Sequence, residues 1–253
     1  MIKVSGFDFR NKVSDCIGGN CQDNVPIGCW NTSEVTDMTK AFFNHRFNKS
    51  INCWNVASVT DMYSMFYRAS NFNQSLNDWD VASVTAMNEM FFLASDFNQP
   101  LHDWNVASVN NMNAMFSSAT DFNQSLNDWD VARVNDMKFM FGGATYFNQP
   151  LNDWNVASVN SMNSVFFDAY NFNQSLDDWN VASVTSMSGI FYKAPSFNQS
   201  LDDWNVASVN DMRSMFNTAY AFNQPLDDWN VASVTKMNGM FFRASDFNQC
   251  LSS

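Results

Sequence analysis

The stretch Leu76–Pro100, LNDWDVASVTAMNEMFFLASDFNQP, decides the fold because it recurs almost unchanged along the chain. The tryptophans show the recurrence, since they fall 25 residues apart after a first interval of 24. They are Trp30, Trp54, Trp79, Trp104, Trp129, Trp154, Trp179, Trp204 and Trp229. Internal repeats of roughly 20 to 50 residues are typical of solenoids, in which each repeat packs on its neighbours.

The apolar positions inside one repeat change their spacing halfway along. Trp79 and Val81 alternate with Asp78 and Asp80, as in a strand. In the following stretch, 84–94, apolar residues recur every three or four positions, which is typical of a short helical or 3₁₀ segment. Neither piece can bury its apolar side alone, so we predict an α/β repeat solenoid whose stacked turns share one core.

The pattern L-x-x-W-x-V-x-x-V of residues 76–84 resembles the leucine-rich-repeat signature, with Trp and Val in leucine positions. Its continuation, V-T-x-M-x-x-M-F-x-x-A, is similar to the bacterial surface type of that repeat, found in BspA-like proteins and mycoplasma-type surface lipoproteins. The resemblance covers residues 26–251. It implies parallel Trp-x-Val strands on the concave face and short helical or 3₁₀ segments on the convex face. A right-handed β-solenoid is the alternative architecture.

The two ends of the chain depart from the repeat. Residues 1–25 do not fit it, and we expect them to form an N-terminal cap, because the end of a solenoid exposes its core. Residues 26–253 then form a single solenoid of about nine repeats, the last one incomplete, with an open C-terminal edge. Cys250 has no evident partner there and is a candidate for an intermolecular disulfide.

The chain is acidic, with 13 Lys and Arg against 25 Asp and Glu and a formal net charge of −12. This charge disfavours nucleic acids and anionic membranes as partners. No apolar run approaches the roughly 18 residues of a membrane span, so we expect no direct membrane insertion. The N-terminal residues do not contain the apolar segment of a signal peptide, which either has been removed or was never present.

Four of the five cysteines lie near the N-terminus. Cys29 and Cys53 each precede a repeat tryptophan and so occupy equivalent places on neighbouring turns. In-register neighbours lie about 5 Å apart, within the Cα range of a disulfide. We therefore predict a Cys29–Cys53 bridge and a second bridge between Cys16 and Cys21, with reduced thiols as the alternative. Two disulfides would indicate an oxidising compartment, and so an extracellular or cell-surface protein.

An aspartate stands immediately before each of the later tryptophans. The column consists of Asp78, Asp103, Asp128, Asp153, Asp178, Asp203 and Asp228. Stacked like charges repel, so the column is a candidate metal or ligand site, for Ca²⁺ in particular, which binds carboxylate and carbonyl oxygens. The alternative is that each aspartate accepts hydrogen bonds from local backbone amides and carries a solvated charge.

Six Asn-x-Ser/Thr sequons are candidate glycosylation sites: Asn31, Asn48, Asn73, Asn123, Asn173 and Asn198. All but Asn31 belong to the repeated Phe-Asn element, whose asparagine we expect to form an inward ladder bonded to backbone of its own turn and the next. Such a ladder leaves Asn31 as the best glycan acceptor, if the protein passes through a eukaryotic secretory route.

Catalysis finds little support in the sequence. The two histidines, His45 and His102, occur at single turns, and no arrangement of nucleophile, base and orienting group recurs around them. The cysteines lack the C-x-x-C spacing of zinc or thioredoxin-like sites. We expect a protein that is not an enzyme, with no catalytic residues and no cofactor apart from the Ca²⁺ considered above.

These features predict a surface or extracellular scaffold or adhesion protein. It would assemble head to tail through its open C-terminal end, or bind another surface protein or a glycan. The main alternative is a monomeric recognition module that binds a peptide, a glycan or a Ca²⁺-bridged partner on an acidic concave face. A weaker alternative is ice binding by the Ser58 and Thr60 columns, which Arg133 interrupts.

Overall fold

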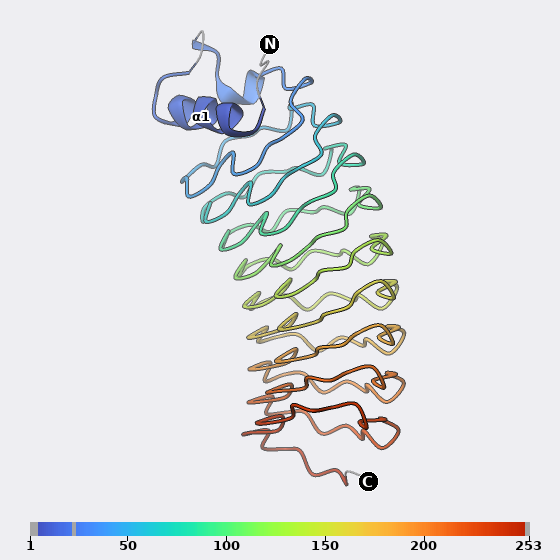
Figure 1. Cartoon of the computed structure of the whole chain (residues 1–253). Helices are drawn as coiled ribbons and strands as arrows, with labels where there is room; N and C mark the ends of the chain where they lie inside the picture. Colours follow the sequence, from blue (N-terminus) through green and yellow to red (C-terminus); the bar gives the residue numbers. More distant parts are fainter. Residues whose placement is uncertain (1–4, 22–23, 251–253) are drawn as a thin grey trace.

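The computed structural model describes residues 5–21 and 24–250. Figure 1 shows the chain winding into a stack of similar coils, with helix α1 at the N-terminal end and the C-terminus at the other. Helix α1 spans Gly6–Ile17, and the 3₁₀ helix η2 spans Ile27–Cys29. The chain is therefore a repeat solenoid, as predicted. Residues 1–4 and 22–23 of the predicted cap and residues 251–253 of the predicted solenoid lie outside the described residues.

Neighbouring coils are held in register by isolated parallel bridges. They run from Asp37↔Asp61 to Asp211↔Lys236, one for each pair of successive coils. On either side of each bridge the backbone bonds run in both directions. The Met62 amide donates to the carbonyl of Ala86 at 3.0 Å, and the Thr85 amide donates to the carbonyl of Thr60 at 2.9 Å. Each coil thus both donates to and accepts from its neighbours.

The strands expected at Trp-x-Val do not form, because tight turns bracket this segment on both sides. The Trp79 amide donates to the Leu76 carbonyl at 3.1 Å, and the Val84 amide donates to the Val81 carbonyl at 2.9 Å. The Asp80 side chain reinforces the second turn by accepting from the Ala82 amide at 3.2 Å. The extended backbone between the turns is too short for a strand, and regular strands are absent from the described coils.

The helical segment expected after Val84 is also replaced by turns. The Phe92 amide donates to the Glu89 carbonyl at 3.1 Å, whereas the adjacent Phe91 amide donates to Met115 of the next coil at 2.8 Å. Glu89 and Leu93 have φ of 56° and 58°, in the left-handed region that interrupts a right-handed helix. The backbone therefore alternates between bonds within a coil and bonds to the next coil, and within the described repeats no helix follows Val84.

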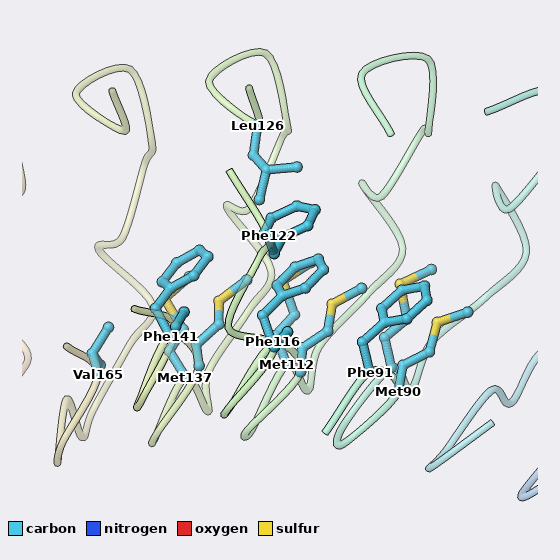
Figure 2. Packing of buried hydrophobic residues seen from close by; sticks show 14 of the residues in the cluster. Met90, Phe91, Met112, Phe116, Phe122, Leu126, Met137, Phe141 and Val165 are labelled. Atoms are coloured by element: carbon cyan, nitrogen blue, oxygen red, sulfur yellow. The ribbon is translucent and has the colours of Figure 1, made fainter. Parts of the chain in front are cut away.

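The core is a set of aromatic and methionine columns that run through the stack. Figure 2 shows Phe91, Phe116 and Phe141 from successive coils lying in a row inside the turns, with methionines beside them. The rings of Phe91 and Phe116 are stacked at a centroid distance of 5.6 Å. The tryptophans form a parallel column, in which Trp154 and Trp179 lie 6.3 Å apart with an interplanar angle of 1°. Aromatic pairs contribute about 0.5–1.5 kcal/mol each beyond the burial of their area.

Helix α1 closes the N-terminal end of this core. Phe9 is fully buried and packs edge-on against Trp30 and Trp54, at centroid distances of 6.3 and 5.5 Å. Just before the helix, Ser5 Oγ accepts from the Asp37 amide at 2.6 Å. The Gly6 amide donates to the Asp37 carbonyl at 2.8 Å, in the same way that the Met38 amide of the first coil donates to the Asp61 carbonyl of the second. Within the described residues, no helix is long and apolar enough to cross a membrane.

Candidate functional site

Several aspartates of the column before the tryptophans are held by asparagines of the preceding coil. Asn52 Nδ2 donates to Asp78 Oδ2 at 2.9 Å. The same contact joins Asn77 to Asp103, Asn127 to Asp153 and Asn152 to Asp178. Each of these contacts gives a carboxylate of the column a hydrogen-bond donor, which offsets part of the repulsion that first suggested a cation. The hydrogen bonds that we expected from local backbone amides therefore come, at these aspartates, from side-chain amides of the neighbouring coil.

The column changes toward the C-terminus, where aspartate replaces that asparagine at Asp177, Asp202 and Asp227. One carboxylate oxygen of Asp177 and one of Asp202 are buried without a hydrogen-bond partner in the described part of the chain. However, no group of three His, Cys, Asp or Glu side chains in residues 5–21 and 24–250 is placed to hold a metal ion. The geometry gives no support to the Ca²⁺ site, which stays a prediction.

The asparagines of the Phe-Asn element form a continuous hydrogen-bonded ladder. Asn73 Oδ1 accepts from the Asn98 amide at 3.0 Å and from Gln99 Nε2 at 2.9 Å. The same pair of bonds recurs from Asn48 to Asn223. The predicted bonds from each asparagine to the backbone of the next turn are confirmed, but the asparagines are half-buried or exposed and do not point inward. The glutamine that follows each asparagine is a second donor that the sequence did not reveal.

The six sequon asparagines fall into two kinds. Five use their side-chain oxygen in the ladder: Asn48, Asn73, Asn123, Asn173 and Asn198. Asn31 lies outside the ladder, is exposed, and accepts from the Ser33 amide at 3.1 Å. Asn31 is thus an exposed sequon asparagine whose oxygen is not used in the ladder, and glycosylation of any of the six stays a prediction.

The tryptophans have a second role that sequence reasoning missed. Trp104 Nε1 donates to the Leu76 carbonyl at 2.8 Å, and the same bond recurs along the stack to Trp229, which donates to Leu201 at 2.9 Å. Burying an indole is favourable when its N–H finds such a partner. The signal was present in the sequence, because a leucine recurs three residues before nearly every tryptophan.

One of the two predicted cysteine pairs is confirmed. Cys16 and Cys21 are joined by a disulfide. Cys29 and Cys53 are free and exposed, so the predicted Cys29–Cys53 bridge is not formed in this structure. Cys29 is the last residue of η2, and its amide donates to the Pro26 carbonyl at 2.9 Å. Cys53 does not lie in a 3₁₀ helix, so the backbone differs at the two cysteines. Cys250 is also free and exposed.

The four N-terminal cysteines nevertheless line one cavity of about 500 Å³. Its walls come from the end of α1, from η2 and from the segment 46–53, and they include the side chains of Arg46 and Lys49. The cavity lies where the repeat is one residue short, since Phe42 and Phe47 are five residues apart while Phe66 and Phe72 are six apart. The first coil therefore packs on the second differently from all later pairs.

An open groove, also of about 500 Å³, runs beside the asparagine ladder. It is lined by Asn73, Asn98 and Asn123 together with Asp96, Asp121 and Tyr146. The side chain of Tyr146 is 55% exposed. An exposed aromatic ring beside carboxylates and amides offers both stacking and hydrogen bonds to a polar ligand.

The histidines and the hydroxyl columns offer less. The side chains of His102 and Asp103 are both exposed, and His102 Nε2 lies 3.7 Å from Asp103 Oδ1. His45 lies on the first coil, where burial and nearby Arg10 lower its pKa. The two histidines lie on separate coils and cannot act in one catalytic arrangement. Ser58 Oγ donates to the Ser33 carbonyl at 3.0 Å, so the hydroxyl of this column is already used by the backbone of the preceding coil. This use disfavours ice binding.

The last described coil exposes side chains that are buried in every earlier coil. Val231 is 41% exposed, whereas Val206 in the preceding coil is 1% exposed. Met237 is 42% exposed, whereas Met212 is fully buried. Val231 and Met237 form an exposed apolar surface at this end of the described stack, which we call the C-terminal face.

A continuous stack of 25-residue coils, with its recurring polar side chains used in internal ladders, defines a solenoid repeat protein. The chain belongs to the family described as "Mycoplasma protein of unknown function, DUF285", which matches residues 11–129, 101–195 and 171–253. The resemblance to mycoplasma-type repeats is thus confirmed, and the BspA-like part of it stays a prediction.

Two solved structures are similar to this chain at low identity. One is an internalin (InlF) from Listeria monocytogenes, at 8% identity over 78% of each chain with a TM-score of 0.27. The other is the TLR13–ssRNA13 complex, at 10% identity over 78% of this chain and 36% of that chain, with a TM-score of 0.25. A comparison with curated proteins gave no match.

Proposed function

We propose that this chain is a non-catalytic scaffold or adhesion protein of the cell surface, and that its C-terminal face is covered by a further repeat coil, which a second copy of residues 1–253 can supply. The observation that carries the proposal is the exposure of Val231 and Met237 in the last described coil. Burying such side chains is worth about 1.5–3 kcal/mol each. Association of this 253-residue chain would remove them from water.

The arrangement of the two ends favours tail-to-tail over the head-to-tail assembly expected from the sequence. Helix α1 already covers the first coil, with Phe9 packed on Trp30 and Trp54, so an incoming coil would meet the helix there. Two C-terminal faces can pair about a two-fold axis if the face is complementary to itself. In the preceding coil, the equivalent face binds the last coil in both directions: the Met212 amide donates to the Lys236 carbonyl, and the Asn210 carbonyl accepts from the Thr235 amide.

The Cys16–Cys21 disulfide supports placement outside the cytosol, because structural disulfides form and persist in oxidising compartments. The formal charge of −12 favours a cationic or neutral partner over nucleic acid or an anionic membrane. Both observations are consistent with a role in contacts at the cell surface, with another protein or a glycan as the further partner.

Light-scattering mass across a concentration series tests this proposal. We expect a concentration-dependent dimer, and we expect Met237→Glu to shift it to monomer because the charge cannot be buried in the interface. Phe139→Glu is the matched control, since Phe139 is 44% exposed in the middle of the stack. A monomer at all concentrations, or equal dissociation by Phe139→Glu, would contradict the proposal. Reductant and Cys250→Ser show whether an intermolecular disulfide contributes.

The groove beside the asparagine ladder favours a second candidate, a recognition module for a peptide, a glycan or a Ca²⁺-bridged partner. Thermal melting with and without Ca²⁺ tests the cation, because binding to the native state must raise the midpoint. An unchanged midpoint at saturating Ca²⁺ ends that idea. Calorimetric titration with an oligolysine peptide, against the Tyr146→Ala variant, tests the groove itself.

A further inference from the structure

The cavity at the N-terminal end brings together four of the five cysteines of the chain. Cys16 and Cys21 enter it as a disulfide, while Cys29 and Cys53 enter it as free, exposed thiols. The site lies at the opposite end of the stack from the C-terminal face, so what it does is independent of the function proposed above. A disulfide and two thiols around one solvent-accessible space are the components of thiol–disulfide exchange.

The coil geometry places Cys29 and Cys53 next to each other in the stack. Each precedes a tryptophan, and the rings of Trp30 and Trp54 are stacked at 6.3 Å with an interplanar angle of 6°. Beside Cys29 the two coils are in close contact, because a Cβ on Gly28 would lie 2.4 Å from the Ser50 carbonyl oxygen. The backbones on either side of the two thiols are therefore held together.

The charge of the cavity wall is specific to this place. Lys49 stands where the later coils carry glutamine, and Arg46 stands where they carry residues such as Asp96 and Asp121. Both cations are exposed at the cavity, within a chain whose formal charge is −12. A small anionic molecule is therefore attracted to this cavity and repelled by most of the remaining surface.

We propose that this cavity is a thiol–disulfide exchange site for a small anionic disulfide, and that the reaction joins Cys29 to Cys53. A volume of about 500 Å³ is of the size that accepts a small organic ligand. Metal binding is the competing use of two thiols, but within the described residues no third His, Cys, Asp or Glu completes a metal site. Exchange needs only the two thiols and an external disulfide.

The reaction balances without a further oxidant. One protein thiolate attacks a sulfur of the small disulfide, forming a mixed disulfide and releasing the other half as a thiolate, which takes up a proton. The second protein thiolate then attacks the protein sulfur of the mixed disulfide. The Cys29–Cys53 bond forms, the bond to the small molecule breaks, and a second thiol leaves. Two protein thiols are oxidised while one small disulfide is reduced to two thiols.

The experiment uses the full chain carrying Cys250→Ser, so that Cys29 and Cys53 are its free thiols. The protein is treated with glutathione disulfide, and intact mass, released thiol and non-reducing peptide maps are followed over time. We expect loss of two hydrogens without a retained adduct, and a Cys29–Cys53 cross-linked peptide. In Cys53→Ser the reaction stops at a glutathione adduct on Cys29, which identifies the intermediate.

The anionic preference is tested with the Arg46→Gln, Lys49→Gln pair of substitutions. We expect a slower reaction with glutathione disulfide, by about two- to fivefold, as is typical of exposed charge pairs. The reaction with neutral 2-hydroxyethyl disulfide should be unchanged, which controls for a change in the accessibility of the two thiols. Stable adducts on both Cys29 and Cys53, or cross-links to Cys16 or Cys21 in their place, would overturn the proposal. Equal slowing with both probes would overturn its electrostatic part.

Discussion

At the scale of single residues, backbone strain is repeated at two positions in nearly every coil. Non-glycine residues with φ near 55° include Ser64 and Arg68 in the second coil and Glu89 and Leu93 in the third. A left-handed conformation costs an L-residue roughly 1 kcal/mol relative to glycine. The amides at these positions donate to the next coil, as the Arg68 amide does to Phe92 at 2.7 Å, and these bonds hold the strained conformation.

Thr218 offers the sharpest test of this strain, because it is β-branched and has φ of 62°. The equivalent position three coils earlier is Gly143, with φ of 72°. We expect Thr218→Gly to raise the free energy of unfolding by about 1 kcal/mol, measured by urea denaturation. Thr218→Val is the control, since it keeps the branching and loses the hydroxyl bond to Asn217 in the same way. If the glycine variant is no more stable than the valine variant, strain at this position is negligible.

His45 gives the N-terminal coil a dependence on pH. Burial, with a further contribution from Arg10, lowers the pKa of His45 below its ordinary 6.5. The unfolded chain therefore takes up the proton first, so this contribution to stability is present above pH 6.5 and is lost as the pH falls below it.

We expect His45→Gln to flatten the melting temperature between about pH 5 and pH 7, the range over which histidine titrates. His102→Gln, at an exposed position beside Asp103, is the matched control for the loss of a histidine side chain. The idea fails if the profile of the His45 variant follows that of the unaltered protein.

At the scale of the coil, the asparagine ladder is the polar element most closely tied to register. Asn123 Oδ1 accepts from the Asn148 amide at 3.0 Å and from Gln149 Nε2 at 2.9 Å. Removing it leaves two donors without their acceptor, of which one is a part-buried backbone amide. An unsatisfied buried donor costs about 1–3 kcal/mol.

We therefore expect Asn123→Ala to lower the free energy of unfolding by about 1–3 kcal/mol in urea denaturation. Asn123→Asp keeps an oxygen in the accepting position and should cost less. Equal losses in the two variants would mean that the packing of the side chain, and not its hydrogen bonds, holds the turn.

The coil is also where sequence reasoning reached its limit. The repeat length, the buried Trp, Phe and Met columns and the asparagine ladder all follow from spacing, because identical turns must bury the same side chains. The backbone conformation does not, since residues such as Glu89 and Leu93 carry no signal for a positive φ, and Gly143, Gly189 and Gly239 mark only three of these positions. The cavity at the first coil arises from the missing residue between Phe42 and Phe47, whose effect on packing requires the structure.

At the scale of the whole molecule, the stack is a one-dimensional chain of interfaces with different ends. Each coil bonds only to the coils beside it, so a local loss of stability is felt by neighbours and fades with distance. One end is covered by α1, and the other exposes Val231 and Met237. Hydrogen exchange should therefore be fastest in the last coil of this 253-residue chain and slowest in the middle coils.

Phe9→Ala tests whether α1 protects the stack in this local manner. Phe9 is fully buried against Trp30 and Trp54, and removing a buried phenylalanine costs about 3 kcal/mol or more. In a cooperative globule this loss would speed exchange throughout the molecule. In a nearest-neighbour stack it speeds exchange of the Met38 and Phe42 amides, which bond to the second coil, and leaves the Phe141 amide, four coils further on, unchanged. Hydrogen-exchange mass spectrometry separates the two outcomes, because a uniform increase would show that the coils unfold together and that the cap stabilises them all.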